Sequence, residues 1–106
     1  LEHLAHPEPI GAELVRVMAP GGVLFVTVPD IHKYGTHFWD DVTHKRPHSA
    51  ASLRHLFEGH GLETLALQPY NHNLFIAGNL FPRPIHHWLM RFRGRALMYV
   101  GRKSAR

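Results

Sequence analysis

The strongest hydrophobic pattern in the chain covers residues 23–28, VLFVTV, in which every side chain except Thr27 is apolar. A strand without a polar face needs cover on both sides, which is typical of a parallel sheet with helices on each face. The segment therefore predicts an α/β fold of the doubly wound kind. The strand also needs neighbouring elements to cover it, and these can lie outside the given sequence.

An amphipathic helix is predicted directly before this strand. Prolines are favoured in the first turn of a helix, so Pro7 and Pro9 mark its beginning, and the Pro-Gly-Gly turn at residues 20–22 marks its end. Its apolar face is expected to contain Ile10, Leu14 and Val17, with Val15 and Met18 beside them.

A long irregular stretch, residues 30–48, is predicted after the strand, and a second helix follows it. Ser49 can cap this helix, and Gly59 and Gly61 close it. Its apolar face is expected to contain Leu53, Leu56 and Phe57. Two further strands are predicted at residues 62–67, ended by Pro69, and at residues 96–100. A short helix between them would use Ile85, Trp88, Leu89 and Phe92.

Composition narrows the class of protein. The chain has 106 residues, 44% of them hydrophobic, which is enough for one domain with a core. Cysteine is absent, which excludes disulfides and thiolate chemistry and fits a cytoplasmic protein. The sequence has no apolar run long enough for a membrane span, so we expect no transmembrane segment.

Charge is distributed unevenly. The formal net charge is +4, yet every acidic residue lies at or before Glu63. The later part carries only cations, at Arg83, Arg91, Arg93, Arg95, Arg102, Lys103 and Arg106. Such a tail suits a peripheral contact with anionic lipid, a nucleotide-linked substrate or nucleic acid, although a solvated basic surface is the simpler explanation. The helical spacing of Ile85, Leu89 and Phe92 favours a packed helix, and we do not expect a nucleic-acid partner.

Three segments of the sequence resemble the second half of the catalytic domain of class I S-adenosylmethionine-dependent methyltransferases. They are LEHL, ELVRVMAPGGVLFVTVPD and DDVTHKRPHSAASLRHLFEGHGLE. The resemblance covers residues 1 to about 70 well, and the remainder through a closing strand. It implies a Rossmann-like, mostly parallel sheet whose last strand, residues 96–100, runs antiparallel between residues 23–28 and 62–67. The family's glycine-rich turn and acidic cofactor residue are not present, so we expect residues 1–106 to be a C-terminal fragment, inactive alone.

The resemblance places Glu2 and His3 after the family's fourth strand, at the carboxyl edge of the sheet, where ligands of such folds bind. Glu2 would then stabilise the methyl-donor cation as part of the cofactor site. His3 would contact the cofactor or accept a proton from the nucleophile. Without the resemblance, both residues could simply be the solvated start of a loop.

The acidic and basic cluster at residues 40–47 would follow the next strand at the same edge. Similar text occurs in methyltransferases that act on sugars and cell-surface polysaccharides, and His44 is the leading candidate for a general base or substrate orienter. The expected substrate contacts are Phe38, Trp39, Asp41, Thr43 and Arg46. A structural alternative stays open, in which Thr43, His44 and Arg46 tie the loop to the helix at Ser49 by hydrogen bonds. Phe38 and Trp39 could equally be packing residues that cover the open top of the sheet.

Histidine is abundant, with 11 residues, four of them within residues 30–48. Zinc sites are recognised by spacings such as an i, i+4 pair on a helix. His44 and His48 are four apart but lie in the stretch predicted to be irregular, so no recognised pattern is present and we expect no metal. The sequence thus favours methyl transfer from S-adenosylmethionine to a small-molecule or glycan acceptor, at oxygen, in the intact parent protein. The alternative is a non-catalytic interaction module derived from the same fold.

Overall fold

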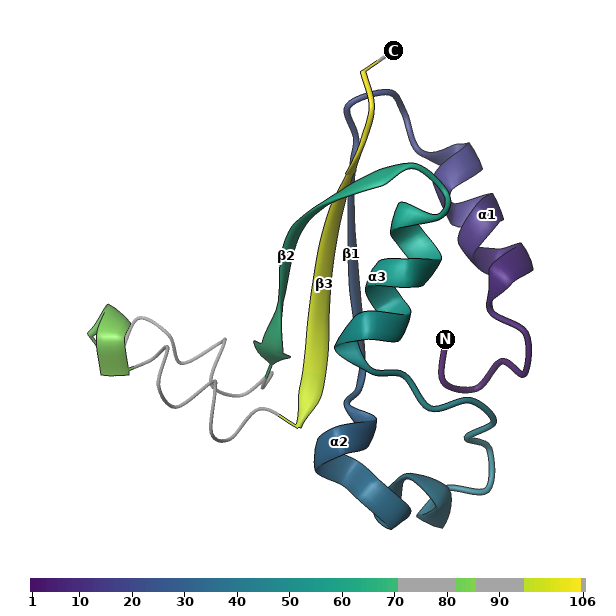
Figure 1. Ribbon diagram of the computed structural model, residues 1–106, viewed down its shortest axis with the longest axis vertical. Coiled ribbons are helices and arrows are strands. Elements are labelled where there is room, and N and C mark those ends of the chain that lie inside the picture. The colour runs from purple at the N-terminus through teal and green to yellow at the C-terminus, as the bar shows by residue number, and fades with distance from the viewer. Residues whose placement is uncertain (71–81, 86–94, 106) are drawn as a thin grey trace.

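The computed structural model describes residues 1–70, 82–85 and 95–105. Three strands form one sheet, β1 (Val23–Pro29), β2 (Leu62–Tyr70) and β3 (Ala96–Lys103), in the order β1-β3-β2 (Figure 1). Strand β3 pairs antiparallel with both neighbours, so Val100 lies opposite Phe25 on one side and Ala66 on the other. The predicted position and direction of the last strand are confirmed.

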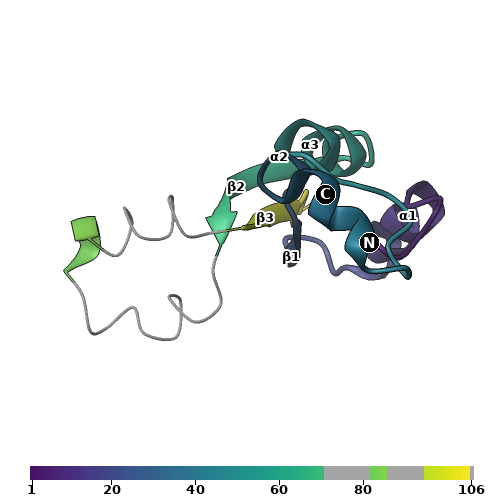
Figure 2. The ribbon, with the colours of Figure 1, turned by 90° about the horizontal axis from the view of Figure 1, so that it is seen from below.

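Helices α1 (Glu8–Val17) and α3 (Ala50–Glu58) pack beside each other next to this sheet (Figures 1 and 2). The predicted cap of α3 is confirmed. The Ser49 side chain accepts from the Ser52 amide at 3.2 Å, and the Ser52 hydroxyl accepts from the Ser49 amide at 2.8 Å, which satisfies two donors at the helix start.

The buried face of α1 agrees with the predicted one only in part, since Leu14, Val15 and Met18 pack in the core but Ile10 and Val17 do not. Gly11 and Val15 are buried, whereas Ile10 is 42% and Val17 66% exposed. The reason is the close approach of α3, because a Cβ at Gly11 would lie 3.1 Å from Leu56 Cδ1. Helix α1 therefore faces α3 with Gly11. A prediction from hydrophobic periodicity does not include glycine in the buried face.

The main core fills the space between the two helices and one face of the sheet. Its buried members are Val15, Val28, Leu53, Phe57, Leu62, Leu97 and Tyr99. Phe57 and Tyr99 stack at 4.8 Å between ring centroids, and both are fully buried. This contact joins α3 to the central strand and supplies much of the apolar burial on that face.

The other face of β1 is open in the described residues. Val23 is 54% and Phe25 52% exposed, although the all-apolar strand predicted cover on both sides. Phe25 meets Tyr70 of β2 edge to face at 6.1 Å across β3. Among the described residues, only one face of β1 is covered, so the prediction that both faces are covered is wrong for this part of the chain. The exposed apolar face of β1 would still be stabilised by another element packed over it.

Two segment boundaries also correct the sequence-based expectations. Strand β2 continues through Pro69 to Tyr70, which an edge strand permits because a proline there need not donate to a ladder. The stretch 30–48, expected to be irregular, contains α2 (Ile31–Tyr34) and a 3₁₀ helix, η1 (Gly35–Asp40). Of the helix predicted from Ile85, Trp88, Leu89 and Phe92, only Ile85 is among the described residues, where it is helical. Among those described, no helix has the length and apolarity required to cross a bilayer.

Lys103, the last residue of β3, closes the end of α1. Its Nζ donates to the carbonyls of Val15 at 2.7 Å and Met18 at 2.9 Å. A cation in contact with the unsatisfied carbonyls of a helix C-terminus is stabilising. At least one residue of the basic tail thus has a structural task inside the fold.

Replacing Lys103 with methionine keeps the aliphatic stem and removes the ammonium group. We expect the free energy of unfolding, measured in urea, to fall by about 1–2 kcal/mol because the helix carbonyls lose their charged donor. The matched control is Lys45→Met at an exposed side chain, with an expected change within about 0.5 kcal/mol. Equal losses in the two variants would contradict the capping role.

Asp30 and His48 fix the two ends of the stretch 30–48 to each other. They form an isolated parallel bridge, and the Ile31 amide donates to the His48 carbonyl at 3.0 Å. The His48 side chain is 3% exposed, and within the described part of the chain its Nε2 has no hydrogen-bond partner. Burial lowers the pKa of His48 below its ordinary value; the Leu1 backbone opposes this, and the amino terminus and Arg46 add to it.

This lowered pKa makes stability depend on pH. The unfolded chain binds a proton at His48 more readily than the folded chain, so the contribution is complete above about pH 6.5 and is lost as the pH falls through the folded pKa. The free energy of unfolding of the unmodified protein should fall as the pH is lowered from about 7.5 to 5. In His48→Gln this fall should be smaller, by up to about 1.4 kcal/mol for each unit by which the pKa of His48 is lowered.

Urea titrations across this pH range provide the measurement. The same series on His32→Gln, which removes an exposed imidazole, shows what an ordinary histidine contributes. If the free energy of unfolding depends on pH identically in the unmodified protein and in His48→Gln, the buried imidazole does not contribute to that dependence.

Candidate functional site

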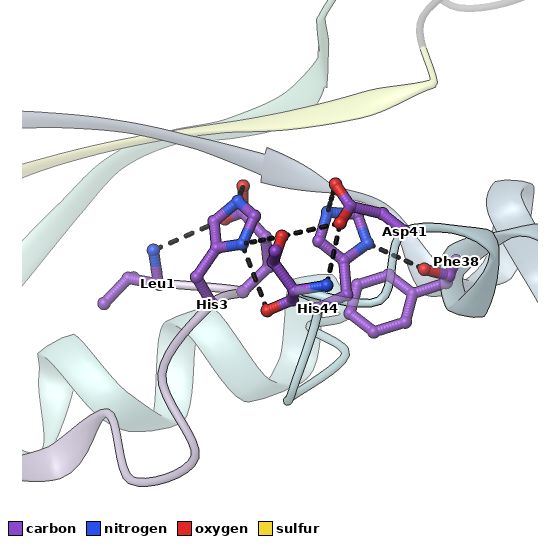
Figure 3. Close-up of polar contacts among 7 residues, drawn as sticks. Leu1, His3, Phe38, Asp41 and His44 are labelled. Carbon is purple, nitrogen blue, oxygen red and sulfur yellow. Dashed lines mark hydrogen bonds and ion pairs between the residues drawn. The ribbon is translucent and has the colours of Figure 1, made fainter.

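Residues 1–3 lie against the end of the loop that follows β1, although about forty positions separate them in the sequence. The Glu2 carbonyl accepts hydrogen bonds from the amides of Lys45 at 2.8 Å and Arg46 at 3.1 Å. This main-chain contact sets Glu2 and His3 beside Asp41, Thr43 and His44 (Figure 3). Five of the site residues proposed from the sequence therefore meet in one cluster.

His44 is held by the backbone and by an aromatic ring. Its Nδ1 lies 2.7 Å from the Phe38 carbonyl oxygen, and its ring stacks on Phe38 with 4.5 Å between centroids. Because a carbonyl oxygen can only accept, Nδ1 carries the proton and donates. In the neutral ring, Nε2 therefore has the free lone pair. That atom is 3.5 Å from Asp41 Oδ2, and the side chain is 12% exposed.

His3 has the same arrangement with different partners. Its Nδ1 lies 3.2 Å from the Thr43 carbonyl and 2.9 Å from Thr43 Oγ1. The Thr43 hydroxyl donates to Asp41 Oδ1 at 2.6 Å, so its oxygen accepts from the imidazole and Nδ1–H is again the donor. The free Nε2 of His3 is 3.4 Å from Glu2 Oε1.

Both carboxylates of the cluster are stabilised in the ionised form. The hydrogen bonds from the Thr43 side chain and amide hold the pKa of Asp41 below its usual value. Partial burial would raise the pKa of Glu2, but a hydrogen bond from its own amide, the amino terminus and His3 outweigh burial and lower it. The cluster therefore places two carboxylates beside the Nε2 atoms of two imidazoles.

The other proposed substrate residues lie around this cluster. Phe38 is fully buried and forms the platform under His44, while Trp39 packs edge-on against it and is 54% exposed. Arg46 Nη2 lies 3.9 Å from Glu8 Oε1. Arg46 also lines a groove of about 570 Å³ between α1 and α3, whose lining does not include Glu2, His3 or His44.

Two features of the site were missed by sequence-based reasoning. Asp30 and His48 hold the loop closed at its base, and the only available signal was that an acidic residue directly follows a buried strand. The Phe38 carbonyl that orients His44 is a main-chain group, so no side-chain pattern could reveal it. Asp41 and Thr43 form hydrogen bonds with each other inside the loop, which is not the predicted tie to the helix at Ser49.

Two solved structures share the fold of this chain. One is a chain from the complex between the Haloferax volcanii Trm112 methyltransferase activator and its methyltransferase, with a TM-score of 0.68 and 21% identity over 97% of this chain and 50% of that one. The other is a protein described as a sarcosine dimethylglycine methyltransferase from Galdieria sulphuraria, with a TM-score of 0.58 and 20% identity over 97% of this chain and 49% of that one.

No family model and no curated protein matches the chain. At this level of identity, the two structures establish the fold, which is that of a methyltransferase domain. The chain spans about half the length of each of them.

Proposed function

We propose that the chain is the C-terminal half of a class I methyltransferase domain, and that the intact parent transfers a methyl group from S-adenosylmethionine to an oxygen of a small-molecule or glycan acceptor. The observation that carries the proposal is His44, whose Nδ1 is committed to the Phe38 carbonyl and whose Nε2 lone pair faces the cluster. An imidazole held in this way is suited to general-base catalysis.

The chemistry requires little beyond alignment and removal of one proton. S-adenosylmethionine, when bound, supplies a methyl group that its sulfonium already activates. His44 Nε2 would accept the proton of the acceptor hydroxyl as its oxygen forms the new bond to the methyl carbon, while the carbon–sulfur bond breaks and the donor leaves as a neutral thioether. The resulting imidazolium is stabilised by Asp41, whose Oδ2 lies 3.5 Å away and whose lowered pKa keeps it ionised.

The remaining groups of the cluster position these components. The Glu2 carboxylate suits the neighbourhood of a cation such as the sulfonium, and His3, held by Thr43, lies between Glu2 and His44. Trp39 offers an exposed aromatic surface to an acceptor, and Arg46 offers a donor fork at the adjacent groove. The fit to the methyl donor is partial, because the family's glycine-rich turn is absent from this sequence.

A second candidate, an interaction module without catalysis, is favoured by one observation. Val23 and Phe25 expose apolar surface on β1, which is an edge strand of the described sheet. The first proposal assigns this surface to contact with the other half of the domain. The Haloferax methyltransferase is found in complex with an activator protein, so a protein partner for this chain is part of the second candidate.

Calorimetric titration of the full-length parent with S-adenosylmethionine distinguishes the two candidates. We expect saturable binding at one site. A folded parent that binds no methyl donor would reject the catalytic proposal and leave the interaction module.

The general-base role has its own test in the parent. His44→Ala should lower kcat for methyl transfer by at least tenfold, within the usual range for a proton-transfer group, with little change in the affinity for S-adenosylmethionine. His37→Ala is the matched control, because His37 also faces an aspartate three residues away, Asp40 at 3.1 Å, but lies exposed outside the cluster. Unchanged kinetics in His44→Ala would remove this residue from the mechanism.

A further inference from the structure

Glu2, His3 and His44 bring three metal-type donor atoms together. One ligand atom from each residue can be chosen so that all three lie within 4.8 Å of one another. Glu2 Oε1 and His3 Nε2 are 3.4 Å apart, which is about the separation of two ligands on a tetrahedral ion with bonds of about 2.1 Å. The His3 and His44 rings lie 4.9 Å apart between centroids.

The hydrogen bonds around the two imidazoles match those of metal-binding histidines. Such a histidine typically donates its other ring N–H to a carbonyl or carboxylate, which fixes the tautomer and directs the lone pair to the ion. His44 does this with the Phe38 carbonyl, and His3 does it with the Thr43 carbonyl and hydroxyl. These partners leave Nε2 of both rings available.

Charge in the cluster favours a cation. Glu2 supplies one carboxylate to the cluster, and the Asp41 carboxylate lies 3.5 Å from His44 Nε2. Glu2 Oε1 is directed toward His3, with Nε2 of that ring 3.4 Å away. Glu2 and His44 are mostly buried, whereas the His3 side chain is 50% exposed, so the cluster has one accessible side.

We propose that Glu2, His3 and His44 bind one divalent transition-metal ion through a carboxylate and two imidazole nitrogens, with open positions for water or an acceptor oxygen. Two nitrogen ligands and one oxygen suit Zn²⁺, Co²⁺ or Fe²⁺, and they disfavour Mg²⁺ and Ca²⁺, which prefer oxygen ligands alone. The ligands come from residues 2, 3 and 44, so no local spacing in the sequence reveals the site.

Binding of the ion does not depend on the proposed methyl transfer. Only a role in lowering the pKa of an acceptor hydroxyl rests on that function. If the ion has that role, it binds the His44 lone pair that would otherwise accept a proton. His44 therefore cannot be a metal ligand and a general base at the same time. The test therefore measures metal binding in the absence of any methyl donor.

The experiment is a zinc titration of the chelator-treated protein, followed by calorimetry. We expect one site of micromolar or higher affinity, unaffected by excess Mg²⁺, and weakened at least about tenfold in His3→Gln and in His44→Gln. His37→Gln is the control for the other histidines, and its affinity should equal that of the unmodified protein. Cobalt should give visible absorption bands of a low-coordinate site that are lost in the same two variants.

His44 packs on Phe38, so His44→Gln could disturb folding, and circular dichroism checks this. His3 is half exposed, and His3→Gln keeps the test decisive whatever happens to His44→Gln. Zinc binding of equal affinity in His3→Gln and His37→Gln, or no binding at micromolar zinc, would overturn the proposal.

Discussion

The antiparallel pairing of β3 with both neighbours is the constraint on which the rest of this structure depends. Strands β1 and β2 run in the same direction, and β3 lies between them, so both point their carboxyl ends to the same edge. The stretch 30–48 leaves β1 at that edge and is fastened there by the Asp30 and His48 bridge. Lys103, at the far end of β3, ties α1 to the same strand. The position of the cluster therefore follows from the sheet.

The cluster itself is organised mainly by backbone groups. The Glu2 carbonyl brings residues 2 and 3 to the loop, and the carbonyls of Phe38 and Thr43 set the orientation of His44 and His3. Carbonyl oxygens accept hydrogen bonds in all conditions, so both rings are held in one tautomer without needing a charged partner. Two Nε2 lone pairs and two ionised carboxylates then share a small, partly buried volume. This combination supports proton transfer and metal binding alike, which is why both proposals concern the same residues.

Much of the fold could be predicted from local patterns. The apolar run 23–28, the proline and glycine signals around α1 and the Ser49 cap each correspond to an observed element, because these signals act over a few residues. The face of α1 was predicted only in part: Leu14, Val15 and Met18 pack in the core, but Gly11, which contacts Leu56, carries no hydrophobic signal. The site was predicted only as a set of residues. The geometry of the site depends on main-chain hydrogen bonds between residues about forty positions apart. The spacing of residues in the sequence does not predict such contacts.

Both proposals depend on His3 and His44 being held with Nδ1 protonated and Nε2 free. Long-range ¹H–¹⁵N correlation spectra of the imidazoles, recorded without added metal at about pH 8 where an ordinary histidine is neutral, report the tautomer of each ring directly. The account predicts the Nδ1–H tautomer for both residues, with unprotonated Nε2 signals. An Nε2–H tautomer for His44 would contradict it, since the lone pair would then face the Phe38 carbonyl and neither base catalysis nor metal binding could use it.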